Sequence, residues 1–86
     1  MAETFDRIIV QVDTHSGIEL VEVVRTQANI QIAVRDKQRG LGMNFSTDYS
    51  ETNRDWSARE VAVDFIKCAY EMKDLEIQEL SKQWVN

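Results

Sequence analysis

The sequence is poor in the residues that carry covalent or metal-based chemistry. It contains a single cysteine, Cys68, a single histidine, His15, and no proline among 86 residues. One cysteine cannot form a disulfide within the chain, and one cysteine with one histidine falls short of the ligands that a structural zinc site needs. We therefore expect no metal and no cofactor. The unpaired thiol favours a reducing compartment, and we predict a cytoplasmic protein.

Long apolar runs are also missing. No stretch approaches the roughly 20 apolar residues that a membrane-spanning helix needs. The first ten residues include Glu3, Asp6 and Arg7, which do not fit the apolar region of a signal peptide. We expect neither a membrane segment nor secretion. A chain of 86 residues has room for one domain, residues 1–86, with one core.

Positive charge is in short supply. The net charge is −5, and the excess of carboxylates lies in residues 48–79. Binding to nucleic acid depends on clustered lysines and arginines that neutralise phosphates, so this composition disfavours that function without excluding it. An acidic surface instead suits a protein that binds a basic partner.

The first half of the chain has the pattern of a sheet. Residues 5–12, 30–35 and 41–45 alternate apolar with polar side chains, which is typical of half-buried strands. Residues 18–26 are ambiguous, because Ser16 and Glu19 could form a helix capping box. Many residues of that stretch are β-branched, which disfavours a helix, so we predict a strand. The adjacent Leu20 and Val21 break the alternation and predict a bulge or burial on both faces.

The second half has the pattern of a helix that begins after Ser57. Ser57 and Glu60 have the spacing of a capping box. The apolar stripe expected to face the core consists of Val61, Phe65, Cys68, Ala69 and Met72. One helix that continued from this start to Val85 would be about 42 Å long, which exceeds the width of so small a domain. Either the helix breaks near Asp74, or its end projects and packs elsewhere.

These elements predict an α+β fold in two layers. A four-stranded antiparallel sheet is followed by a C-terminal helical segment, one long helix or two shorter ones, packed on one face. The alternative is a β-α-β-β-α order with a helix at residues 18–26. The predicted helix has to cover the apolar face formed by Ile8, Val10, Ile32, Val34, Met43 and Phe45.

The only basic cluster lies around Gly40-Leu41-Gly42. A phosphate-binding P-loop needs a longer glycine loop that ends in Gly-Lys-Ser/Thr and opens a helix, whereas this segment runs into strand residues. We interpret it as a hairpin turn. Its cations, Arg35, Lys37 and Arg39, are a candidate site for an anion or an acidic partner.

Two further sets of residues are candidates for contacts with partners. Glu71, Asp74, Glu76 and Glu79 form an acidic band, which is either a solvated helix face or a docking surface for a basic partner. Ile77, Leu80 and Trp84 form a terminal apolar set. A terminal tryptophan predicts a docking site, either on the chain's own sheet or between the helices of a homodimer.

Catalytic residues are hard to find. The lone His15 lies among turn-forming residues, and we interpret it as a solvated loop histidine. Cys68 lies on the predicted apolar stripe, where a cysteine behaves as a small hydrophobic core residue. A small enzyme, the least favoured alternative, would need one of them in a concave site beside Asp13 or Glu60.

The sequence therefore predicts a small acidic interaction protein without catalysis, of an accessory or inhibitory kind. It would bind a protein partner, with a homodimer as a further possibility, and it shows no sign of a small-molecule substrate. The alternative function is a nucleic-acid-binding module that uses the basic hairpin at residues 35–39.

Overall fold

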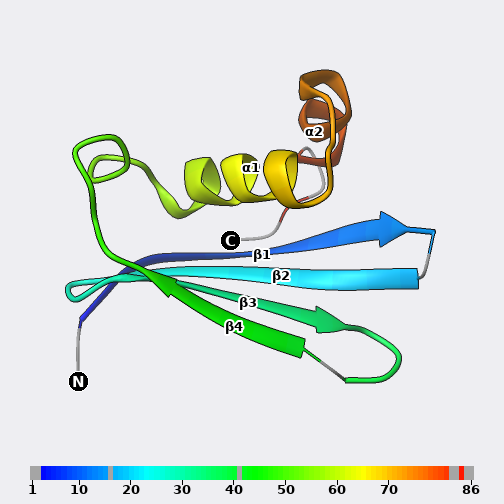
Figure 1. Cartoon of the computed structure of the whole chain (residues 1–86), viewed down its shortest axis with the longest axis horizontal. Helices are drawn as coiled ribbons and strands as arrows, with labels where there is room; N and C mark the ends of the chain where they lie inside the picture. The colour runs from blue at the N-terminus through cyan, green and yellow to red at the C-terminus, as the bar shows by residue number, and fades with distance from the viewer. Residues whose placement is uncertain (1–2, 16, 41, 82–83, 85–86) are drawn as a thin grey trace.

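The computed structural model describes residues 3–15, 17–40, 42–81 and 84, and it shows a sheet with two helices on one side (Figure 1). The elements in chain order are β1 (Thr4–Thr14), β2 (Gly17–Thr26), β3 (Ile30–Asp36), β4 (Gly42–Thr47), α1 (Ala58–Ala69) and α2 (Asp74–Ser81). The predicted α+β fold is confirmed, with two short helices rather than one long one. Residues 18–26 are a strand, so the β-α-β-β-α alternative is wrong.

The four strands form an antiparallel meander in the order β1-β2-β3-β4. Val10 pairs with Val21, and Val21 pairs with Val34, so these side chains share the face beneath the helices. The pairing of β2 is regular through Leu20, so of the two predicted explanations, a bulge or burial on both faces, the bulge is wrong. Leu20 instead lies half-buried on the opposite face from Val21, because the side chains of a strand alternate.

The turn between β3 and β4 is the predicted hairpin. The Asp36 carboxylate accepts the backbone N–H groups of Gln38 and Arg39, both at 2.9 Å, and the Gly40 N–H donates to the Asp36 carbonyl at 2.9 Å. Gly40 has a φ of 71°, which glycine adopts without the steric cost of a side chain. Gly42 is needed for a different reason, since a Cβ there would lie 2.4 Å from the Val34 carbonyl oxygen.

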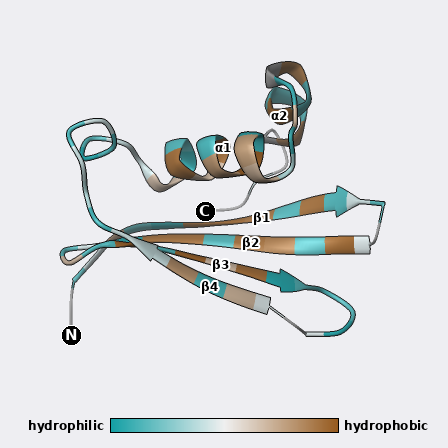
Figure 2. Ribbon diagram, viewed as in Figure 1, coloured by the Kyte–Doolittle hydropathy of each residue, from teal (hydrophilic) through white to brown (hydrophobic). Residues whose placement is uncertain are grey.

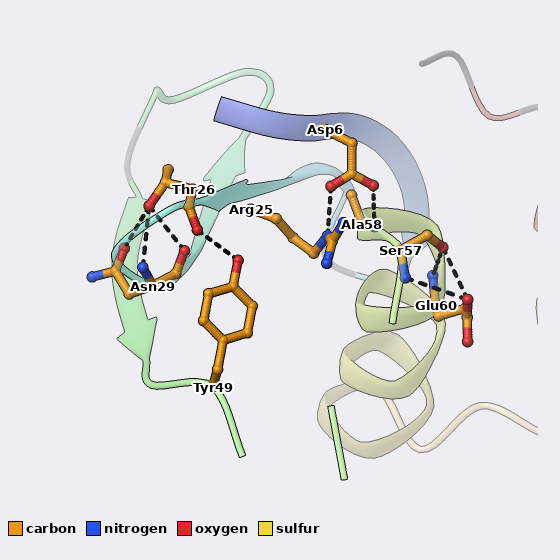
Figure 3. A network of polar contacts seen from close by, with 8 residues as sticks. All are labelled: Asp6, Arg25, Thr26, Asn29, Tyr49, Ser57, Ala58 and Glu60. Atoms are coloured by element: carbon orange, nitrogen blue, oxygen red, sulfur yellow. Dashed lines mark hydrogen bonds and ion pairs between the residues drawn. The ribbon is translucent and has the colours of Figure 1, made fainter. Parts of the chain in front are cut away.

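The start of α1 is fixed by two sets of hydrogen bonds (Figure 3). Ser57 and Glu60 form the predicted capping box, which satisfies N–H groups that the first turn leaves without a partner. The Asp6 carboxylate of β1 also accepts the Ala58 N–H at 2.7 Å and the Arg25 Nε–H at 2.5 Å. This one carboxylate therefore joins β1, β2 and α1.

The helical segment breaks between Tyr70 and Asp74, which is one of the two arrangements that we predicted. Tyr70 caps α1, and Glu71 follows with a φ of 54°, in the left-handed region that ends many helices. The Tyr70 hydroxyl donates a hydrogen bond to the Glu19 carboxylate of β2. Burial, and then this bond to a carboxylate, raise the pKa of Tyr70, because both favour the neutral phenol.

The core lies between α1 and the β1–β2 half of the sheet, with part of β3. Its buried apolar residues are Ile8, Val10, Val12, Val21, Val23, Ile30, Ile32, Ala58, Val61, Ala62, Ile66 and Ile77. Figure 2 shows the apolar strand residues beneath the helices. The early strands thus bury the side chains that their alternation predicts.

Part of the predicted helix stripe is wrong. Val61 is buried, but Phe65 and Met72 are only half-buried, and Cys68 and Ala69 are exposed. The stripe was centred on a helix that reached Met72, whereas α1 ends at Ala69. The residues that the structure buries beside Val61 are Ala58, Ala62 and Ile66, which lie on the neighbouring side of the helix, so the buried face is rotated from the predicted stripe.

The predicted cover of β4 is also wrong. Met43 and Phe45 point to the helix side, as expected from their pairing with Val34 and Ile32. They nevertheless remain 61% and 44% exposed. α1 packs on β1 and β2, and β4 extends away from the helices (Figure 1).

Candidate interaction surface

The face of the sheet opposite the helices is uncovered by any described element (Figure 1). Strand pairing places one set of side chains on this open face: Arg7, Ile9, Leu20, Glu22, Val24, Gln31, Ala33, Arg35 and Asn44. Ile9 is 38% exposed, and Leu20, Val24 and Ala33 are half-buried by their neighbours alone. The open face therefore has an apolar centre drawn from three strands.

Two shallow hollows mark the open face. One, of about 200 Å³, is lined by Arg7, Ile9, Leu20, Glu22, Ala33 and Arg35. The other, of about 380 Å³, lies toward β4, and Glu22, Ala33 and Arg35 line both. Because the two hollows share these three residues, they adjoin each other on the open face.

The charges of the open face differ in how they are neutralised. Arg7 forms an ion pair with Glu22 on the neighbouring strand. Arg35 forms no ion pair or hydrogen bond through its side chain with any other described residue. Arg35 is therefore the cation of this face that remains available to a carboxylate of a partner.

The structure separates the three predicted cations of the hairpin. Arg35 belongs to β3 and the open face, and the Lys37 amine donates to the Gln11 side-chain oxygen at 3.3 Å, also on that face. The Arg39 guanidinium lies 3.8 Å from the Asp36 carboxylate. The Arg39 backbone N–H, together with that of Gln38 and the Arg39 charge, lowers the pKa of Asp36. Arg39 is thus partly neutralised at the tip, while Arg35 and Lys37 outnumber the one carboxylate, Asp13, at the same end of the open face.

The acidic residues are likewise not a single patch. Glu71 lies in the connection between the helices, whereas Glu76 and Glu79 are one turn apart on α2. All three side chains are exposed, and the side chain of Asp74 lies outside the described residues. Only Glu76 and Glu79 are brought to one face of a helix.

The terminal apolar set packs against the chain's own core. Ile77 is 3% exposed and belongs to the core, and Leu80 and Trp84 are half-buried against it. The Arg59 guanidinium lies 5.2 Å from the Trp84 ring centroid. We predicted docking on the chain's own sheet or between the helices of a homodimer; in the single chain this set packs against the core, and Ile77 is already buried there.

The lone histidine and cysteine are both exposed, His15 after β1 and Cys68 in the last turn of α1. Neither side chain has a hydrogen bond or an ion pair with another described residue. Within those residues, no three histidine, cysteine or acidic side chains could hold a metal ion together. The enzyme alternative gains no support from this arrangement.

Sequence reasoning missed the free edge of the sheet at β4. All six residues of this strand are exposed, and Gly42–Thr47 includes no charged residue. β1, at the opposite edge, carries Asp6, Arg7 and Asp13 and has an irregular register near Thr4. The signal in the sequence was the lack of charge in residues 42–47, since exposed edges are usually protected by charges, prolines or bulges.

No family model, curated protein or solved structure matches the chain. Neither helix within the described ranges combines the length and the apolar composition that crossing a membrane requires. The surface chemistry of the chain is therefore the basis for a functional proposal.

Proposed function

We propose that the chain is a non-catalytic interaction protein that binds a protein partner through the open face of its sheet. The observation that supports this proposal is a sheet face with an apolar centre that no described element covers. Contiguous apolar surface on a small protein typically marks a site of interaction. The proposal places this function in the cytoplasm, which the single cysteine favours.

The chemistry of the open face indicates what kind of partner would fit. Ile9, Leu20 and Val24 offer apolar surface, and Arg35 and Lys37 add positive charge at one end. A partner segment with an apolar anchor beside a carboxylate would complement both features, because Arg35 could form a two-pronged ion pair with that carboxylate. The exposed Glu76 and Glu79 on α2 remain a candidate second contact for a basic partner.

Affinity capture from an extract of the native host tests this proposal. The bait proteins are the wild type, an Ile9→Lys variant and an Arg35→Glu variant. Leu75→Lys is the matched control, since it places the same charge on an exposed apolar residue of α2. Circular dichroism checks that all baits are folded.

The expected result is one protein that the wild type and Leu75→Lys retain and that Ile9→Lys and Arg35→Glu lose. Recovery by all four baits, or by none, contradicts the proposal. The nucleic-acid alternative predicts a different outcome, in which nuclease treatment of the extract removes the captured material and charge reversal at Arg35, Lys37 or Arg39 prevents its capture.

A further inference from the structure

The two edges of the sheet differ in how well they are protected against pairing. β1 carries charged side chains and an irregular start, both of which hinder the addition of another strand. β4 is a regular six-residue strand without charge, and no described strand lies beyond it. Its outward N–H and C=O groups can therefore pair with a further strand.

The side chains next to this edge are apolar and largely uncovered. Met43 and Phe45 lie on the helix side of β4, and the Phe45 ring is 6.0 Å from that of Phe65 on α1. A hollow of about 270 Å³ adjoins Met43 and Val34, and its other walls include the charged Glu19, Asp36 and Arg39. A strand added to β4 would bring its own side chains against this apolar strip.

The charges at the two ends of β4 have opposite signs. Residues 36–39 carry Lys37 and Arg39 beside Asp36, for a net charge of +1, and residues 48–55 carry three acids and one arginine, for −2. If two β4 strands pair antiparallel, the basic end of each lies beside the acidic end of the other. A parallel arrangement would bring like charges together, so the charge pattern selects the antiparallel one.

We propose that a second copy of this chain pairs with β4 in the antiparallel sense and joins the two four-stranded sheets into one. A two-fold axis perpendicular to the sheet relates the copies and keeps the helices of both on the same side. With the axis through Asn44, Met43 of each copy lies opposite Phe45 of the other. That register pairs a thioether with an aromatic ring and places Arg39 next to Asp48 of the second copy.

This inference goes beyond the proposed function, and neither depends on the other. The open face lies on the side of the sheet away from the helices, whereas the dimer uses the edge of β4. Pairing would place the two open faces side by side in one larger surface. Variants of the open face and variants of the edge therefore test the two proposals separately.

Sedimentation velocity over a range of micromolar concentrations tests the dimer. The wild type is expected to form a dimer in a reversible, concentration-dependent manner. Met43→Lys, which places a charge beside the edge, should raise the dissociation constant roughly tenfold or more. Leu75→Lys is the control and should match the wild type. A wild type that stays monomeric, or a dimer that tolerates Met43→Lys, overturns the proposal.

Charge exchange tests the relative direction of the strands. Arg39→Glu alone should weaken the dimer, because it brings two acids together at each end. Arg39→Glu combined with Asp48→Arg restores opposite charges and should recover most of the lost affinity. If the double variant is as weak as the single one, the antiparallel arrangement is wrong.

Crosslinking tests the register. In a Cys68→Ser background, Asn44→Cys places one cysteine at the proposed two-fold axis, so mild oxidation should give a disulfide-linked dimer. Gln11→Cys is the matched control, since it lies exposed on the edge strand β1 and points to the same face. Equal crosslinking by both variants would contradict pairing at β4. The Ile9→Lys variant should still dimerise, so a failed capture experiment on the open face would leave this result standing.

Discussion

The two halves of the sheet share one sequence pattern and differ in burial. Val10 of β1 and Val21 and Val23 of β2 are fully buried beneath α1, whereas every residue of β4 is exposed. A helix is about 10 Å wide and neighbouring strands are about 4.8 Å apart, so one helix covers roughly two strands. α1 covers β1 and β2, while α2 packs against α1 rather than over β4.

The difference shows that alternation decides which way a side chain points, but not whether anything covers it. Met43 and Phe45 have the same orientation as Val21 and Val23, and only the distance from α1 leaves them exposed. The strands beneath α1 contribute buried apolar surface to stability, whereas the exposed apolar side chains of β4 can contact another molecule. The stability of the fold should therefore reside mainly in the β1–β2 half.

The largest expected effect comes from shortening one side chain in the covered part of the fold and one on β4. Ile66→Ala removes a fully buried side chain of α1, and the lost burial and the cavity should lower the free energy of unfolding by about 2–5 kcal/mol. Met43→Ala removes an exposed side chain of β4 and should change it by less than about 1 kcal/mol. Urea unfolding at low protein concentration measures both values. Equal losses would mean that both halves of the sheet are equally covered.

A smaller effect on the free energy of unfolding should follow from changing the Asp6 carboxylate, whose hydrogen bonds join β1, β2 and α1. Asp6→Asn removes the negative charge that accepts hydrogen bonds from Arg25 and from the Ala58 N–H. We expect a loss of about 1–3 kcal/mol in the free energy of unfolding, because the Arg25 guanidinium would be left without its carboxylate. Asp13→Asn is the control, as an exposed carboxylate on the same strand, and should have an effect within about 0.5 kcal/mol. If urea unfolding gave equal losses of stability for both variants, the hydrogen bonds of Asp6 would not contribute to stability.

The sequence predicted the features that depend on neighbouring residues. The capping box of Ser57 and Glu60, the hairpin turn after Asp36 and the strand at residues 18–26 are all short-range patterns, and the structure contains each of them. The capping box and the turn were predictable because hydrogen bonds from the backbone to a side chain a few residues away do not depend on the rest of the fold. The strand was predictable from its β-branched residues, which disfavour a helix.

The features that depend on distant residues were missed. Asp6 forms a hydrogen bond with Ala58, 52 positions away in the sequence, and Tyr70 forms one with Glu19, 51 positions away. No local sequence pattern predicts these contacts. Cys68 is exposed because α1 turns Ala58, Ala62 and Ile66 toward the sheet, and the sequence of the helix alone did not identify that face. The exposure of Met43 and Phe45 depends on how far the helical layer reaches across the sheet, which no residue of β4 encodes.

The smallest test concerns the contact between Tyr70 and Glu19, which joins the end of α1 to β2. Burial raises the pKa of Tyr70, and the bond to the Glu19 carboxylate raises it further. An unfolded tyrosine ionises near pH 10, so above about that pH the unfolded state loses a proton that the folded state keeps. The contribution of Tyr70 to stability is therefore complete below about pH 10 and falls as the pH rises further.

The difference in free energy of unfolding between the wild type and Tyr70→Phe should accordingly stay constant up to about pH 9.5 and shrink as the pH rises above about 10, with urea unfolding at each pH as the measurement. Comparison with the phenylalanine variant cancels the titration of the other groups. Glu19→Gln should weaken this pH dependence without abolishing it, because burial is the larger cause of the raised pKa and remains. A difference that stays constant with pH would mean that the Tyr70 hydroxyl is solvated, and that α1 is anchored to the covered half by apolar packing alone.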